Sequence, residues 1–425
     1  MSTTIRDAVR SSSSATARWR RSPAAVMLVT LLAAALSAHA AAAQDVDPRS
    51  TARTRIGPLY VTPRFELRDL GIDSNPFNSV EGSDADFTFT AVPEIDLAAG
   101  FRRLLVTGRS RTELTYFAKH DTERSVNQDL GATARLSARR VALSMEASYL
   151  NTRRRASDEI DARSRRKDRA ADVGVVVALS PKLGAEGHVR VARMTFDPNA
   201  VFDDTRLAET LNRDTRTLTG ALSYAVTPLT ALGVSASATR TRFLFAPLRD
   251  SESWRAAAGA TFTPRALVSG VAEVGYQRFT PQLTALPAFS GPVGFVDLSY
   301  RVVQTMRLGL RVNRAITYSY AEQEPYYEVN EVGASIRREL VPGWELEVSA
   351  RRAWHRYQRI GGNPSAEMGG GRVDRLLNGG VRIGYRVGPD TRLDVEASYW
   401  ERRSNQRDFL NFDGVRVGTS VVYGL

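Results

Sequence analysis

Apolar and polar residues alternate strictly over stretches of about ten residues along most of this 425-residue chain. In the clearest stretch, polar or charged residues separate Leu393, Val395, Ala397 and Tyr399. Successive side chains of a β-strand point to opposite faces, so each stretch predicts a strand with one apolar and one polar face. No run after residue 43 approaches 18 apolar residues, and the sequence therefore predicts no transmembrane helix.

Short turns interrupt the alternating stretches at regular intervals. They are predicted near 101–102, 138–140, 181–183, 227–229, 263–265, 303–304, 341–343 and 388–390. Longer polar segments lie between them, for example at 73–85, 152–168, 197–212, 319–326, 359–372 and 402–409. Eight short turns divide the chain into nine hairpins, which predicts an all-β fold of about 18 strands, with 16–20 as the range.

A β-propeller and a soluble β-sandwich are the alternative all-β folds. A period near 40 residues fits propeller blades, but each blade holds four short strands and no Gly-His or Trp-Asp signature recurs here. A sandwich needs shorter strands that share one core. Membrane-spanning strands of about 9–11 residues instead alternate between lipid and lumen and must close into a barrel. We therefore expect a transmembrane antiparallel β-barrel with short periplasmic turns and long outer loops.

Aromatic residues cluster at both ends of the predicted strands, where a half-wet ring is favoured at a membrane interface. Near the short turns lie Tyr224, Phe262, Tyr300, Trp344, Tyr385 and Tyr423. Near the long loops lie Tyr116, Phe196, Trp254, Tyr276, Tyr318, Trp354, Tyr399 and Trp400. Strands favour aromatic residues in general, but the scarcity of rings at mid-strand indicates two membrane-interface girdles.

The amino terminus has the pattern of a secretory signal peptide. Residues 1–22 carry five arginines and one acid, and an apolar run of 13 residues follows from Ala24 to Leu36. This run is too short for a transmembrane helix, which needs about 20 residues. Small residues after it predict cleavage behind Ala43. We expect a cleaved signal peptide (1–43), a short periplasmic segment (44–56) and a barrel (57–425), exported through the inner membrane to the bacterial outer membrane.

The carboxyl terminus alternates from Val415 to the last residue, Leu425, with Tyr423 third from the end. This pattern resembles the terminal signature of bacterial outer-membrane proteins, which the barrel-assembly machinery reads. Leu425 departs from the usual terminal Phe.

Residues 57–150 carry a second resemblance. A first strand (59–67) precedes the loop sequence Asp-Ser-Asn-Pro-Phe (73–77), and the next strand contains Val-Pro-Glu (92–94). These short motifs resemble a family of outer-membrane β-barrel porins that is often associated with exopolysaccharide loci. The resemblance implies an outer-membrane barrel and a link to polysaccharide export, and it brings no catalytic residues.

The sequence offers little for catalysis or metal binding. It has no Cys and four His, and neither HExxH nor Gly-x-Ser-x-Gly occurs. We expect no enzyme activity, no cofactor and no metal. Asp203 and Asp204 could hold Ca²⁺, although solvated loop charge is the simpler interpretation. The run Arg153-Arg154-Arg155 is interpreted as solvated charge or as a site for lipopolysaccharide phosphates, and not as a nucleic-acid site.

Charged residues of both signs occupy the polar faces of the predicted strands. We expect the following residues to line the lumen: Arg109, Arg111, Glu113, Arg135, Glu146, Arg255, Asp297, Arg301, Arg307, Arg311, Arg337, Glu345, Glu347, Arg351, Arg382, Arg386, Asp394, Glu396 and Arg416. Unpaired charge is excluded from a dry interior, and a barrel of 16–18 strands leaves an aqueous channel. Ion pairs that only stiffen the wall are the alternative.

Porin-like passive passage of polar or charged solutes is the function that these patterns favour. Two alternatives remain open: a component of exopolysaccharide export, and a structural or adhesive barrel. Because the first and last strands of a barrel pair, Arg109, Arg111 and Arg382 are expected to concentrate positive charge on one side and to favour anions. The expected partners are outer-membrane lipid, lipopolysaccharide, the barrel-assembly machinery and, in the export alternative, polysaccharide.

Overall fold

The computed structural model describes residues 52–80, 84–361 and 371–424. The predicted signal peptide, the first part of the segment 44–56 and Leu425 lie outside the described residues. The end of that segment forms a short strand, β1 (Thr54–Ile56), which pairs with the start of the first barrel strand.

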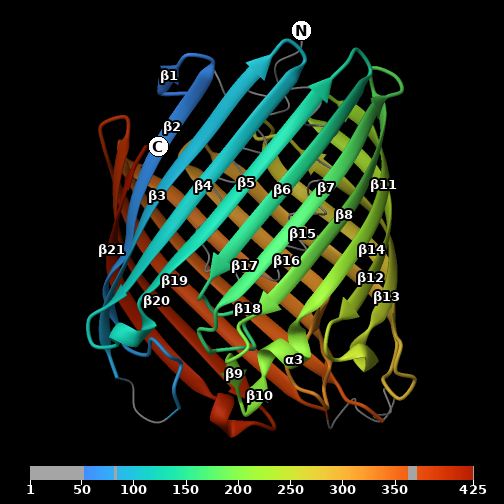
Figure 1. The fold of residues 1–425 in the computed structure, drawn as a ribbon. Coiled ribbons are helices and arrows are strands. Elements are labelled where there is room, and N and C mark those ends of the chain that lie inside the picture. Colours follow the sequence, from blue (N-terminus) through green and yellow to red (C-terminus); the bar gives the residue numbers. More distant parts are fainter. Residues whose placement is uncertain (1–51, 81–83, 362–370, 425) are drawn as a thin grey trace.

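Eighteen antiparallel strands form one closed barrel (Figure 1), which confirms the predicted fold class and strand number. They are β2 (Leu59–Asp73), β3 (Asp86–Phe101), β4 (Leu104–Phe117), β5 (Ser125–Ser137), β6 (Val141–Thr152), β7 (Arg166–Ala178), β8 (Leu183–Phe196), β11 (Arg213–Thr227), β12 (Thr230–Phe243), β13 (Ser251–Phe262), β14 (Val268–Pro281), β15 (Phe289–Val303), β16 (Met306–Tyr318), β17 (Tyr326–Val341), β18 (Trp344–Gln358), β19 (Val373–Val387), β20 (Thr391–Ser404) and β21 (Phe412–Tyr423). Each strand pairs with its neighbours in sequence, and β2 pairs with β21 to close the ring.

Short turns join the strands at one end of the barrel and longer loops join them at the other, as the hairpin pattern predicted. The loops carry the small elements η1 (Asp121–Glu123), β9 (Val201–Phe202), β10 (Thr205–Arg206), α3 (Leu207–Leu211), η2 (Pro247–Arg249) and η3 (Asp408–Leu410). Within the described residues no helix is long and apolar enough to cross a membrane.

The closing seam between β2 and β21 contains a register shift after Leu67. Asp69 has a positive φ of 57° there. At Gly71 a Cβ atom would lie 2.0 Å from the carbonyl oxygen of Val417, so only glycine fits against this backbone. The shift lets Asp69 and Asp73 both reach Arg416 on β21, which adds ion pairs to the seam.

Side chains alternate between the two faces of the barrel wall. On β20, Leu393 and Val395 are 42% and 56% exposed on the outer face, whereas Asp394 between them is 4% exposed. The eleven girdle aromatics other than Phe196, Tyr318 and Trp400 lie in phase with such outward apolar residues. Tyr318 instead packs against the buried clusters inside the barrel. Two cross-strand ring pairs join them, Trp254 with Tyr276 and Trp344 with Tyr385.

Phe196 and Trp400 are exceptions to the predicted girdle. Phe196 is buried in a cluster inside the barrel. Trp400 is buried too, and its indole nitrogen donates a hydrogen bond to Oδ1 of Asn78 at 2.9 Å. Alternation explains the error for Trp400, because it follows the outward residue Tyr399 and must therefore point inward.

Candidate functional site: a loop across the barrel interior

The loop of residues 153–165 joins β6 to β7 and crosses the inside of the barrel. The carboxylate of Asp158 forms an ion pair with Arg351 at the middle of β18. In one direction round the ring, the strands between β7 and β18 are β8 and β11 to β17. In the other direction, the strands between β6 and β18 are β5 to β2 and then β21 to β19. The loop therefore reaches the opposite wall at about half the height of that strand.

Arg402 on β20 is the main anchor of this loop. Its buried guanidinium donates to the carbonyl oxygen of Glu159 at 2.9 Å and to the carboxylate of Asp161 at 3.0 Å. It also donates to Asp374 on β19 at 2.7 Å. Asp374 is further paired with Arg372 at 2.8 Å, so that the anchor belongs to a network of alternating charges.

Further contacts hold the loop near its origin and along its length. Arg154 pairs with Glu113 on β4. Asn78, in the loop between β2 and β3, donates to Asp161 at 2.7 Å. Ser319, in the loop between β16 and β17, donates to Glu159 at 2.6 Å. Contacts from so many parts of the chain fix the loop in one position inside the barrel.

The three acids of the loop experience different environments. Burial raises the pKa of Glu159 to about 7, against the opposing effect of Arg372. Burial also raises the pKa of Asp161, although Arg402 opposes this. For Asp158, burial acts in the same direction, but the guanidinium of Arg351 outweighs it and lowers the pKa. Glu159 is therefore the loop acid that titrates near neutral pH.

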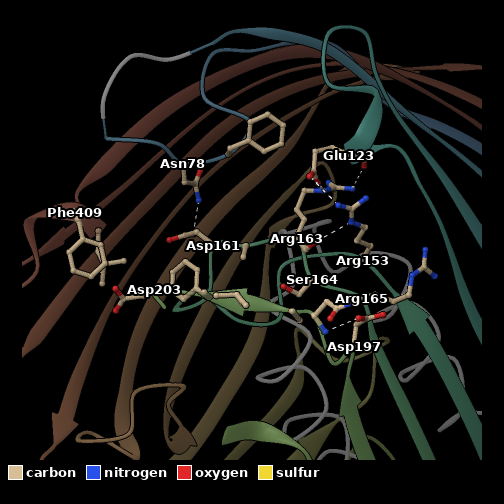
Figure 2. A pocket seen from close by; sticks show the side chains of 17 residues that line it. Asn78, Glu123, Arg153, Asp161, Arg163, Ser164, Arg165, Asp197, Asp203 and Phe409 are labelled. Carbon is tan, nitrogen blue, oxygen red and sulfur yellow. Dashed lines mark hydrogen bonds and ion pairs between the residues drawn. The ribbon is translucent and has the colours of Figure 1, made fainter. Parts of the chain in front are cut away.

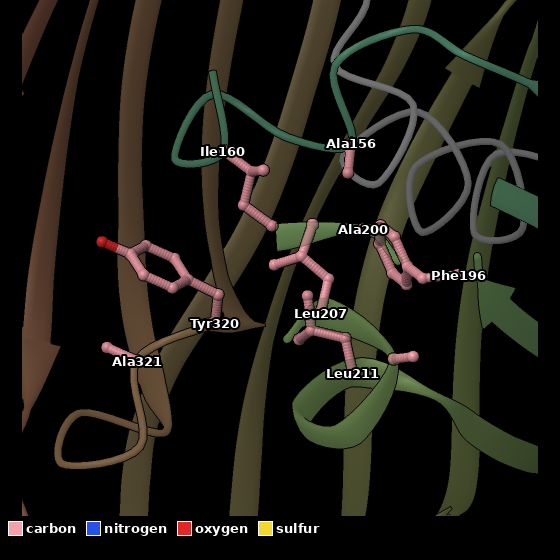
Figure 3. Close-up of a cluster of buried hydrophobic side chains, with 9 residues drawn as sticks. Ala156, Ile160, Phe196, Ala200, Leu207, Leu211, Tyr320 and Ala321 are labelled. Carbon is pink, nitrogen blue, oxygen red and sulfur yellow. The ribbon is translucent and has the colours of Figure 1, made fainter. Parts of the chain in front are cut away.

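A second loop, residues 197–212, packs against the first (Figure 3). Its short helix α3 inserts Leu207 and Leu211 into a buried apolar cluster with Ala156 and Ile160 of the crossing loop. Tyr320, between β16 and β17, completes this cluster. The apolar contacts join both loops into a single internal layer at the long-loop end of the barrel.

A cavity of about 680 Å³ lies between this layer and the neighbouring loops (Figure 2). Its lining combines charged residues with apolar ones: Phe77, Asn78, Glu123, Arg153, Asp161, Arg163, Asp197, Phe202, Asp203 and Phe409. Arg407 ties its edge together by contacts to Asp203 at 3.0 Å and to Glu324 at 3.2 Å.

Several of the loop charges have partners within the chain. Arg154 pairs with Glu113 inside the barrel, so it is not available as an outer-rim site for lipopolysaccharide phosphates. Asp203 accepts hydrogen bonds from Arg407 and from the hydroxyl of Tyr320, at 2.9 Å for the latter. Among the described residues, no group of three His, Asp or Glu side chains could hold a metal ion.

The structure places all nineteen predicted lumen residues on the inner face of the barrel. Most of them form cross-strand ion pairs. Examples are Arg311 with Asp297 at 2.5 Å and Arg109 with Asp96 at 2.8 Å. In the described part of the chain, Glu146, Arg301, Arg307 and Arg386 form no ion pair.

The expected concentration of positive charge between early and late strands is not present. Arg111 pairs with Glu94 at 3.2 Å, and Arg382 pairs with Glu396 at 2.9 Å. Arg109 is likewise paired. Acids on neighbouring strands thus offset the arginines that were expected to favour anions. These acids are visible in the sequence, but which arginine each of them faces depends on how the strands pair.

Sequence reasoning missed the crossing loop and its anchors. Arg402 and Arg372 lie within the strand-to-loop transitions, where alternation gives no information about long-range partners. One feature of the sequence could have indicated this loop: Ile160 stands among three acids in a segment that was interpreted as a solvated loop. A fully solvated loop has no need for a large aliphatic residue.

Solved structures of outer-membrane proteins are similar to this chain. The outer membrane protein opdK from Pseudomonas aeruginosa is 12% identical with a TM-score of 0.49, over 86% of this chain and 98% of that one. OccAB3 from Acinetobacter baumannii is 12% identical with a TM-score of 0.47, over 85% and 98%. The siderophore receptor PirA from Pseudomonas aeruginosa is 8% identical with a TM-score of 0.45, over 87% and 81%.

A search of curated proteins gave no match. A comparison with protein families matched residues 47–424 to the family described as "Putative beta-barrel porin 2". This match covers the whole barrel and agrees with the resemblance seen in residues 57–150. The chain therefore belongs to this porin family and has the fold of an outer-membrane barrel.

Proposed function

We propose that the protein is a passive diffusion channel of the outer membrane for small polar or charged solutes, and that it has no enzyme activity. The loop 153–165 crosses the interior at the long-loop end, reaches the middle of β18 with Asp158, and limits the size of the solutes that pass. The ion pair between Asp158 and Arg351 on the opposite wall is the observation that carries this proposal.

The charged inner wall supports an aqueous lumen. Side chains cannot fill a ring of 18 strands, and larger rings of this kind hold water. The ion pairs on the inner face include partly exposed groups such as Arg109, whose side chain is 58% exposed. Water that hydrates such groups is also the medium through which polar solutes diffuse.

The crossing loop favours small solutes over a polymer. A polysaccharide chain would have to pass a loop that is anchored on several walls, by Arg402 on one side and by Glu113 on another. Polysaccharide export is therefore the second outcome of the test below. In this proposal the outward apolar band contacts outer-membrane lipid and lipopolysaccharide, and β21 is recognised by the barrel-assembly machinery.

Vesicle swelling tests the proposal. Liposomes that contain the refolded protein should swell in small sugars and exclude larger oligosaccharides. Replacing residues 155–162 by Gly-Gly-Ser should raise the size limit. A shift of the protein band on boiling, seen on gels, confirms folding of both forms. Well-folded protein that admits no solute would contradict passive diffusion and would favour the export or structural alternatives.

A further inference from the structure

Three arginines stand in one register row on the inner face, near the short-turn end of the barrel. Arg301 on β15 is directly opposite Arg307 on β16, and Arg307 is directly opposite Arg337 on β17. Residues in such positions have Cβ atoms about 4.5–5.5 Å apart, and like charges placed there destabilise a sheet. A wall that only needed stiffness would place acids at alternate positions of this row.

The acids nearest to this row are already paired with arginines, including Arg337 of the row itself. Glu347 accepts from Arg337 at 3.0 Å and lies 3.5 Å from Arg382. Asp297 is paired with Arg311 at 2.5 Å. Neither Arg301 nor Arg307 forms an ion pair with these carboxylates. Glu345, whose charge also acts on Arg307, is held by Arg392 at 2.9 Å and lies 3.7 Å from Arg337.

Arg301 and Arg307 retain unused hydrogen-bond donors. Arg301 donates to the carbonyl oxygen of Pro264 at 3.1 Å, and Arg307 is exposed to the lumen. Within the described residues neither forms an ion pair, and Glu339, the diagonal neighbour of Arg307 on β17, is not paired with either of them. Two adjacent guanidinium groups with free donors are the arrangement that binds an oxyanion.

We infer that Arg301 and Arg307 form an oxyanion-binding site on the inner wall, at the mouth formed by the short turns. Its ligand is a carboxylate or phosphate group of a small solute, which removes the repulsion between the two side chains. The inference rests on the proposed function, because the anions that bind here are solutes that pass through the channel.

Titration with inorganic phosphate tests the site directly. The full chain, refolded in detergent, is titrated at constant ionic strength by calorimetry, and a parallel titration uses acetate. Saturable binding of either anion is expected, and their ratio distinguishes a phosphate site from a carboxylate site. In the variant R301Q/R307Q, affinity should fall by about tenfold or more, because each lost charge-assisted hydrogen bond accounts for about a tenfold change.

The matched control is R109Q/R255Q, which removes two inner-face charges on β4 and β13 that are paired with Asp96 and Glu273. Its anion affinity should stay within about twofold of that of the parent, because this variant removes no direct contact with the anion. If the double variant does not refold, the single variant Arg307→Gln tests the site instead. It should raise the urea midpoint of unfolding without phosphate, since it removes repulsion, whereas a merely structural arginine would lower that midpoint when lost.

Calorimetry separates this inference from the proposed function. Protein that binds phosphate through these residues but gives no swelling or current would refute the channel and retain the site. Equal affinity of the parent and R301Q/R307Q, or an equal loss in R109Q/R255Q, would overturn the site and leave only a general effect of charge.

Discussion

Replacing Arg402 by Met should release the crossing loop. Arg402 gives the loop two hydrogen bonds from a charged donor, to Glu159 and Asp161. Each is worth about 1.5–3 kcal/mol, so docking should weaken by about 3–6 kcal/mol. No reduction for solvent screening applies, because the side chain is 0% exposed. At 1.4 kcal/mol per tenfold, the released population should rise by about 10² to 10⁴-fold.

A single introduced cysteine measures this release, because the chain has none of its own. Ala156 is 5% exposed in the apolar cluster of the loop, so Ala156→Cys should react slowly with a maleimide while the loop is docked. In the Arg402→Met background the reaction should accelerate by at least about a hundredfold. Arg403→Met is the matched control, because the side chain of this neighbour points outward and pairs with Glu401 and Asp413. Equal labelling rates of Ala156→Cys in the Arg402→Met and Arg403→Met backgrounds would refute the anchoring role of Arg402.

Three further predictions concern the loop acid, the wall and the internal layer. Burial raises the pKa of Glu159 to about 7 from an ordinary value of 4.5, so the docked loop holds the proton more tightly than the released loop. Docking should be strongest below about pH 4.5 and weaken as pH rises through about 7. The labelling rate, divided by that of a free thiol at the same pH because the thiolate is the reactive form, should rise over this range, and E159Q should remove that rise. Ala397→Arg, on the outer face of β20, should cost about 2–4 kcal/mol in unfolding titrations, whereas Ser398→Arg, on the inner face, should cost little; equal costs would contradict the assignment of faces. Leu207→Ala should cost about 2–5 kcal/mol of packing and increase proteolysis within 197–212; unchanged proteolysis would show that the cluster does not hold this loop.

Alternation was sufficient to predict the strands, their faces and the positions of the short turns. On β20, for example, Asp394 and Val395 were assigned to the correct faces from sequence alone, because a strand has a strict period of two. Closure was predictable as well, since unpaired strand edges are excluded from a bilayer.

The crossing loop could not be predicted in the same way. Its contacts join Asp158 to Arg351 and Asp161 to Arg402, which are far apart in sequence and follow no periodicity. The pairing of Arg109 with Asp96 is similar, since it depends on the register between β3 and β4. A charged residue in a single sequence looks the same whether its partner is water or a distant carboxylate.

Current through single barrels with one labelled cysteine tests the channel most directly. Ser349 and Ala350 are neighbours at the middle of β18, on the inner and outer faces respectively. In planar bilayers, we predict discrete current steps for both Ser349→Cys and Ala350→Cys. A bulky, membrane-impermeant thiol reagent should then reduce the current of Ser349→Cys only. Well-folded protein without any current, or an equal effect at the two positions, would contradict a water-filled channel bounded by this wall.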